Sequence, residues 1–71
     1  MDKTVIDFGN FIKEKRIAKG LSQAEVARLL DISQQAYCRY EQGARDPGLT
    51  MIRRIADVLD FQPSDFFNMY I

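Results

Sequence analysis

The 71-residue sequence predicts an all-α fold in which five short helices form one compact domain. Apolar residues recur at i, i+3 and i+4 in successive segments, which is the spacing of a helix with one buried face. Glycine, proline and small polar residues separate those segments, as they do where helices end and begin. The central stretch from Ser22 to Gln42 contains two such segments joined by a tight turn, and the rest of the chain is organised around it.

The first helix is predicted over about residues 5–19. Thr4 is suited to cap its start, and Asp7 lies near its positive end, where an acidic side chain is favourable. Gly20 follows as the residue that adopts the left-handed conformation beyond a helix end. The apolar face of this helix consists of Phe8, Phe11 and Ile12.

The second and third helices are predicted over about residues 23–30 and 34–42. Ser22 and Glu25 form a capping box, which satisfies free amides at a helix start. A sharp turn at Asp31, a residue type that tolerates the left-handed conformation, allows both helices to share one core. That core consists of Val26, Leu30, Ile32, Tyr37 and Tyr40. Two helices joined in this way form a helix-turn-helix.

The fourth and fifth helices are predicted over about residues 49–59 and 63–67, with residues 68–71 as a tail. Gly43 closes the third helix, and a short loop leads to the fourth. Pro63 opens the fifth helix, where its missing N–H has no cost. The buried face of the fourth helix is expected to consist of Leu49, Ile52, Ile55, Ala56 and Leu59.

Several stretches of the chain follow the sequence pattern of one family. They are Phe8-Gly9 and the runs KEKRIAKGLSQAEVARLL, ISQQAYCRYEQG, RDP and IRRIADVLDFQPSDFF. Over about residues 6–67 the sequence therefore resembles the phage-repressor type of helix-turn-helix domain, the Cro/cI or Xre class. The resemblance implies a lambda-repressor-like fold and a transcriptional regulator. It implies a repressor that binds a pseudo-palindromic operator in double-stranded DNA as a homodimer.

The composition excludes several classes of function. Cys38 is the single cysteine and histidine is absent, so the chain has neither an internal disulfide nor the usual ligands of a metal site. It contains no paired base and nucleophile and no phosphate-binding loop, and we therefore expect no enzyme, no cofactor and no metal. No apolar run is long enough to cross a membrane and no signal peptide is evident, which predicts a cytoplasmic protein.

Charge is balanced overall but unevenly distributed. The net charge is zero and the isoelectric point is about 6.1, which counts against a strong attraction to DNA. All ten Lys and Arg residues lie at or before Arg54, whereas the last seventeen residues contain Asp57, Asp60 and Asp65 and no base. We therefore expect DNA to approach one side only, with weak non-specific affinity.

Gln34 and Gln35, at the start of the third helix, are predicted base contacts, together with Arg39. A glutamine amide presents a donor beside an acceptor, which matches N6 and N7 of adenine in the major groove. In isolation such residues would be ordinary solvated side chains, but this half of a recognition helix faces the bases. Arg39 lies four residues after Gln35 on the same face, and contact with guanine and contact with a phosphate both remain open.

Phosphate contacts are predicted for Ser22 and Gln23, at the start of the second helix, where free amides can hold an anion. The resemblance implies that Gln23 binds the DNA backbone and braces Gln34. The remaining predicted phosphate contacts are Cys38, Gln42 and Arg45. The resemblance also implies a salt bridge between Arg16 and Glu41, which would hold the first helix to the third.

Aromatic and apolar residues concentrate at the C-terminal end of the chain. A domain this short cannot bury all of them, and an exposed apolar end indicates a partner surface. The predicted surface for homodimerisation consists of Phe66, Met69, Tyr70 and Ile71. A two-fold dimer through this surface would set two recognition helices about one DNA turn apart. The alternatives are an interaction module, such as an antitoxin that holds its toxin partner through this end, and a restriction–modification controller.

Overall fold

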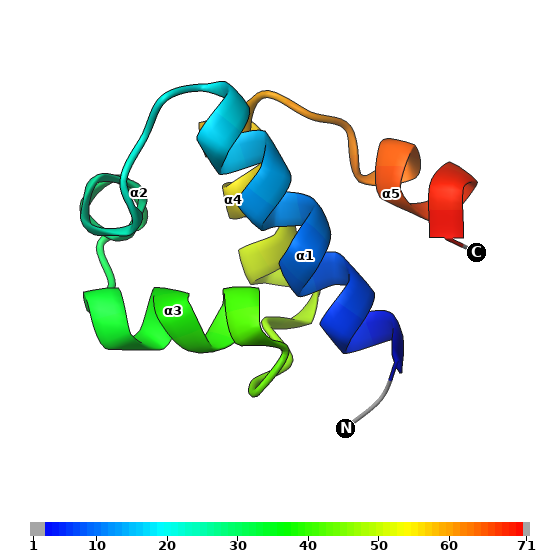
Figure 1. Cartoon of the computed structure of the whole chain (residues 1–71), viewed down its shortest axis with the longest axis horizontal. Helices are drawn as coiled ribbons and strands as arrows, with labels where there is room; N and C mark the ends of the chain where they lie inside the picture. Colours follow the sequence, from blue (N-terminus) through cyan, green and yellow to red (C-terminus); the bar gives the residue numbers. More distant parts are fainter. Residues whose placement is uncertain (1–2, 71) are drawn as a thin grey trace.

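Five helices make up the part of the chain that the computed structural model describes, residues 3–70 without the side chain of Tyr70. They are α1 (Lys3–Ala18), α2 (Gln23–Leu30), α3 (Gln34–Gln42), α4 (Gly48–Leu59) and α5 (Pro63–Tyr70). Figure 1 shows α1 crossing the middle of the molecule, with α2 and α3 on one side of it, α5 on the other and α4 behind. These residues contain no strand, and the all-α prediction is confirmed. Within the same residues, no helix is long and apolar enough to span a bilayer.

The hydrophobic core is built from one face of each helix and from the link between α4 and α5. Its buried members are Phe8, Phe11, Ile12, Val26, Ala27, Leu30, Tyr37, Tyr40, Ile55, Ala56, Leu59, Phe61 and Phe66. The residues that helical spacing assigned to the core of the helix-turn-helix are all among them except Ile32, which is partly buried against the cluster. The apolar periodicity of α2 and α3 therefore predicted their packing correctly.

Four phenylalanine rings fix α5 and the α4–α5 link against α1. Phe11 meets Phe61 edge to face with ring centroids 5.0 Å apart, and Phe8 meets Phe66 in the same way at 5.2 Å. Each such pair adds about 0.5–1.5 kcal/mol to the stabilisation from burial. The expectation that Phe66 is an exposed member of a dimer surface is wrong in its exposure, because this ring is only 3% exposed and completes the core of its own chain.

The predicted helix ends are present around the helix-turn-helix. Ser22 Oγ accepts a hydrogen bond from Glu25 N at 3.0 Å, and Ser22 N donates to Glu25 Oε1 at 2.9 Å. Asp31 ends α2 in the left-handed conformation, with a φ of 58°. Its backbone N–H donates to the carbonyl oxygens of Ala27 and Arg28, which satisfies acceptors in the last turn. The chain therefore turns sharply where the sequence indicated.

Helices α1 and α5 extend beyond their predicted limits by two residues or more. Helix α1 begins at Lys3, so Thr4 lies inside the first turn and does not cap it. Lys3 Nζ lies 2.7 Å from Asp7 Oδ2, and this i, i+4 pair supports the additional turn. Helix α5 continues to Tyr70, where we expected a tail after Phe67, because no glycine or proline interrupts it.

Leu49 was assigned to the buried face of α4, and this prediction is wrong. Its side chain is 79% exposed. Ile55 and Leu59, six and ten residues further along the helix, are buried as expected, and Ile52 is partly buried. Leu49 lies in the first turn of α4, where it lines a surface cavity together with residues of α1 and α5.

Candidate nucleic-acid interface

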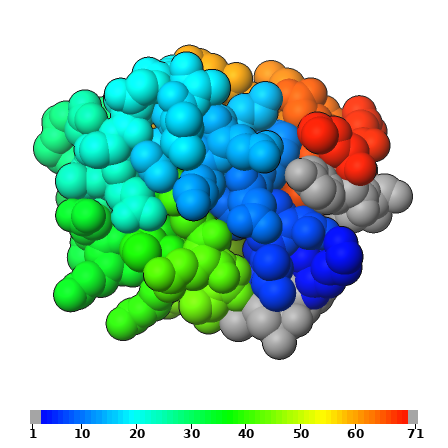
Figure 2. Space-filling model, in the orientation of Figure 1, coloured from blue at the N-terminus to red at the C-terminus, as the bar shows by residue number. Residues whose placement is uncertain are grey.

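The exposed face of α3 and the start of α2 border one surface hollow. Its lining residues are Gln23, Ser33, Gln34, Gln35, Cys38, Arg39 and Gln42. All three predicted base contacts and three of the five predicted phosphate contacts therefore lie together. Figure 2 shows the side chains of α3, in green, projecting from the lower left of the molecule. The structure thus gathers polar groups from two helices on a face that is open to a large ligand.

The helical repeat of α3 separates a core-facing side from this open side. The residues that face the core are Tyr37, Tyr40 and Glu41. Gln34 and Gln35 are exposed in the first turn, and Arg39 is exposed one turn later. Ser33 Oγ accepts a hydrogen bond from Ala36 N at 3.0 Å and so defines where the helix starts. Two amides and a guanidinium on one side present hydrogen-bond donors and acceptors of the types that are complementary to base edges.

The hollow contains one residue that was not predicted, Ser33, and one predicted phosphate contact that is partly buried, Cys38. Ser33 was not among the predicted contacts, although its position directly before Gln34 was an available signal. Cys38 is a half-buried free thiol between the glutamines and the end of α3. The other two predicted phosphate contacts, Ser22 and Arg45, are exposed but do not line the hollow.

The predicted salt bridge between Arg16 and Glu41 is present. Arg16 Nε donates to Glu41 Oε2 at 2.7 Å, and Nη2 donates to Oε1 at 3.2 Å. Arg16 Nη1 also donates to the carbonyl oxygen of Leu21 at 2.9 Å, which fixes the link before α2. The two side chains are 12% and 3% exposed, so this ion pair is largely removed from water. It joins the end of α1 to α3.

Gln23 is bound to the same carboxylate. Its Nε2 donates to Glu41 Oε1 at 3.0 Å. We expected Gln23 to brace Gln34, whereas the hydrogen bond found for its side chain reaches Glu41. One carboxylate on α3 therefore joins residues of α1 and α2.

The network sets the protonation of Glu41. Burial raises the pKa of its carboxyl, but the polar groups of Arg16, Tyr37 and Gln23, in that order of effect, outweigh burial and hold the pKa below its usual value. The hydrogen bond to Glu41 raises the pKa of Arg16 further above its usual value. Burial also raises the pKa of Tyr37, whose phenol oxygen lacks a hydrogen-bond partner among the described residues. At neutral pH, α3 is therefore anchored by a charged pair beside a neutral phenol.

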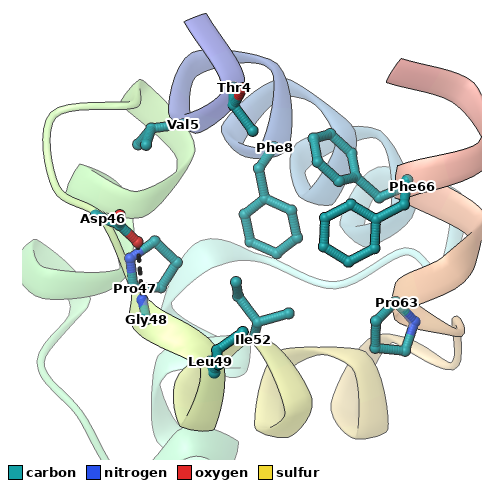
Figure 3. A pocket seen from close by; sticks show the side chains of 11 residues that line it. Thr4, Val5, Phe8, Asp46, Pro47, Gly48, Leu49, Ile52, Pro63 and Phe66 are labelled. Carbon is teal, nitrogen blue, oxygen red and sulfur yellow. Dashed lines mark hydrogen bonds between the residues drawn. The ribbon is translucent and has the colours of Figure 1, made fainter. Parts of the chain in front are cut away.

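A second cavity lies at the opposite end of α1, between the start of that helix, the α3–α4 loop and α5. Its volume is about 260 Å³, and its lining is Thr4, Val5, Phe8, Asp46, Pro47, Gly48, Leu49, Ile52, Pro63, Phe66 and Phe67. Figure 3 shows Phe8, Ile52 and Phe66 pointing into it and Leu49 at its edge. Leu49, Phe67 and Met69 are exposed on this end, at 79%, 42% and 68%. The side chain of Tyr70 and residue Ile71, also predicted at a dimer surface, lie outside the described residues.

The fold and the hollow together define a helix-turn-helix protein with an exposed recognition helix. Residues 12–66 match the Helix-turn-helix family, and the chain belongs to it. The prediction of an Xre-type helix-turn-helix domain is confirmed.

Similar proteins carry the same description. The chain is 36% identical over 52 residues to the SPbeta prophage-derived uncharacterized HTH-type transcriptional regulator YonR of Bacillus subtilis strain 168, covering 73% of this chain and 48% of that protein. It is 33% identical over 58 residues to the uncharacterized HTH-type transcriptional regulator YqaF of the same organism, covering 82% and 76%. The chain thus spans about half of YonR and about three quarters of YqaF.

A solved structure has the same fold. The restriction-modification controller protein C.AhdI from Aeromonas hydrophila superposes with a TM-score of 0.85 and 33% sequence identity. The match covers 93% of this chain and all of that chain.

Proposed function

We propose that this protein represses transcription by occupying a pseudo-palindromic operator as a homodimer. Helix α3 enters the major groove, Gln34 and Gln35 read base edges, and Arg39 contacts a guanine or a phosphate. Ser22, Gln23, Cys38, Gln42 and Arg45 approach the flanking phosphates. The protein acts in the cytoplasm, by binding alone, and needs no cofactor.

The observation that carries this proposal is the convergence of the polar residues in one hollow. Residues that are up to nineteen positions apart, Gln23 and Gln42, line the same open surface. Nothing in the core requires glutamine at Gln34 or Gln35, since both are exposed and the burial of α3 is complete without them. Their placement at the N-terminal end of the second helix is the position from which a helix-turn-helix contacts bases.

The apolar end of the molecule supports the proposed dimer. In the dimer we place Leu49, Phe67 and Met69 between the two copies, with Leu49 of each copy entering the cavity of the other. Phe66 is buried in the single chain and forms one wall of that cavity from its own core, so the entering leucine contacts it there. Isologous packing of this kind uses the same patch on both copies and closes after two.

A restriction–modification controller is the second candidate, favoured by one observation. The structure superposes along the full length of C.AhdI, whose description names that role. A controller in this sense still binds DNA through the same hollow. The two candidates differ in the sign of regulation, which a reporter gene placed behind the selected DNA site measures directly.

Selection of bound fragments from random DNA by the purified protein, at two salt concentrations, tests the proposal. We expect a pseudo-palindrome with half-site centres about ten base pairs apart. Gln34→Ala and Gln35→Ala should each abolish the preference at one or two positions, while Gln62→Ala, the same change at an exposed glutamine away from the hollow, leaves it unchanged. Binding without sequence preference, or equal effects of all three variants, would refute base reading by α3.

A further inference from the structure

Glu41 is the one charged residue that is buried in the described part of the chain. It is 5% exposed and lies on α3 between Tyr40 and Gln42, and it is not among the residues that line the hollow. The side chain of Glu41 is therefore not itself available to contact DNA. Its two oxygens are occupied by three donors from two other helices, at 2.7, 3.0 and 3.2 Å.

The donor from α2 belongs to a residue of the DNA-facing hollow. Gln23 is half-buried, lines the hollow, and gives one N–H of its amide to Glu41 Oε1. The amide nitrogen of Gln23 carries two hydrogens, so its second N–H and its own oxygen, Gln23 Oε1, remain available for a ligand. A long side chain at a helix start is otherwise free to sample several rotamers, which are lost when it binds a ligand. The hydrogen bond to Glu41 restricts that sampling before DNA arrives.

We infer that Glu41 is a positioning residue for DNA binding, which holds the amide of Gln23 so that its free N–H meets a phosphate of the DNA backbone. The inference depends on the proposed function and adds to it the group that prepares the phosphate contact. Arg16 completes the arrangement, because its two hydrogen bonds keep the buried carboxylate charged and fixed in direction. The same contacts also tie α1 to α3, so a test must separate positioning from stability.

The separating experiment removes both charges at once. Arg16→Met combined with Glu41→Leu leaves no unpaired charge in the interior, and such replacements of buried ion pairs often retain the fold. The variant with both Arg16→Met and Glu41→Leu is called the Met/Leu protein. We measure the affinity for the selected DNA site of the wild type, Gln23→Ala, the Met/Leu protein and the variant that combines all three changes. Melting curves give the folded fraction of each protein at the assay temperature, and each measured affinity is corrected for that fraction.

Gln23→Ala and the Met/Leu protein should each weaken binding by about 10-fold, the effect of one charge-assisted hydrogen bond. The combination of all three changes should also weaken binding by about 10-fold, because both routes lose the same phosphate contact. A loss of about 100-fold for the combination, which is the product of two independent effects, would overturn the positioning role. So would wild-type affinity of the Met/Leu protein.

A measurement on the free wild-type protein covers the case in which the Met/Leu protein does not fold. The side-chain amide resonances of Gln23 should shift as Glu41 takes up a proton below its usual pKa, while those of exposed Gln35 do not. The groups that face Glu41 are Arg16 from α1, Gln23 from α2 and Tyr37 from α3, and only the carboxyl itself titrates in that range. Constant Gln23 resonances through this titration would overturn the contact on which the inference depends. Failure of the wild type to select any DNA would instead refute the proposed function.

Discussion

Replacing Gly9 with alanine forces α1 and α3 apart. A Cβ at Gly9 would lie 2.5 Å from the carbonyl oxygen of Glu41 and 2.6 Å from that of Tyr40, and such contacts under 3.0 Å are essentially absent from proteins. Both neighbours are backbone atoms of α3, so no side chain can rotate away. The helices must therefore separate by about half an ångström or more at the point where α1 crosses α3.

The magnitude follows from two opposing effects. Overpacking against rigid neighbours costs about 3 kcal/mol, at the upper end of the usual range. Alanine in a helix interior regains about 1 kcal/mol over glycine. The net loss is about 2 kcal/mol, and in a domain of this size it lowers the melting temperature by roughly 10 °C. The sign is decided by the close approach of the two backbones, since propensity alone predicts a gain.

Thermal unfolding followed by circular dichroism measures this effect. Asn10→Ala is the matched control, because Asn10 is the next residue of α1 and is exposed. We expect Asn10→Ala to melt at or above the temperature of the wild type. Equal melting temperatures for Gly9→Ala and Asn10→Ala would mean that α1 and α3 do not approach as described.

Two further outcomes concern stability. The pKa of Glu41 is lower in the folded chain than its usual 4.5. Its ion pair therefore stabilises the fold fully above that pH, and this stabilisation is lost as the pH falls through the folded pKa. In urea unfolding between pH 6 and 3, the free energy of unfolding should fall less for the Arg16→Met/Glu41→Leu protein than for the wild type. Asp31 has a φ of 58° and no side-chain hydrogen bond is found for it, so Asp31→Gly should raise the free energy of unfolding by about 1 kcal/mol. Unchanged urea midpoints for Asp31→Gly would contradict the strain argument.

The helix-turn-helix could be predicted from the sequence because its determinants are local. The capping box of Ser22 and Glu25 spans three positions, and the left-handed turn at Asp31 follows directly on the apolar repeat of α2. Each signal concerns a few adjacent residues, and each agrees with the others. The placement of Gln34 and Gln35 on the open face follows from the same helical repeat.

The errors concern properties that depend on distant parts of the chain. Phe66 and Met69 were assigned to one exposed surface, but only packing against α1 distinguishes the buried ring from the exposed thioether. Leu49 has the correct spacing for a buried residue but is exposed, at the edge of the cavity between α1, the α3–α4 loop and α5. The bond from Gln23 to Glu41 joins residues eighteen positions apart. Spacing within one helix contains no information about such a contact.

Leu49→Lys tests the proposed dimer. A leucine that is 79% exposed in the single chain gains about 1.5–3 kcal/mol when it is buried, and two-fold symmetry buries it twice. The loss is therefore at least about 3 kcal/mol, which weakens association by about 100-fold or more. Leu29→Lys is the matched control, because Leu29 is 52% exposed on α2, away from the apolar cavity.

Sedimentation equilibrium without DNA provides the measurement. The wild type and Leu29→Lys should be dimers at tens of micromolar, and Leu49→Lys should be a monomer of unchanged helix content. The cavity that Leu49 borders is apolar on the sides formed by Phe8, Ile52 and Phe66, so a lysine amine placed against these sides loses its hydration. A monomeric wild type, or dimers of equal strength in all three proteins, would exclude this end as the surface that sets the two recognition helices on one operator.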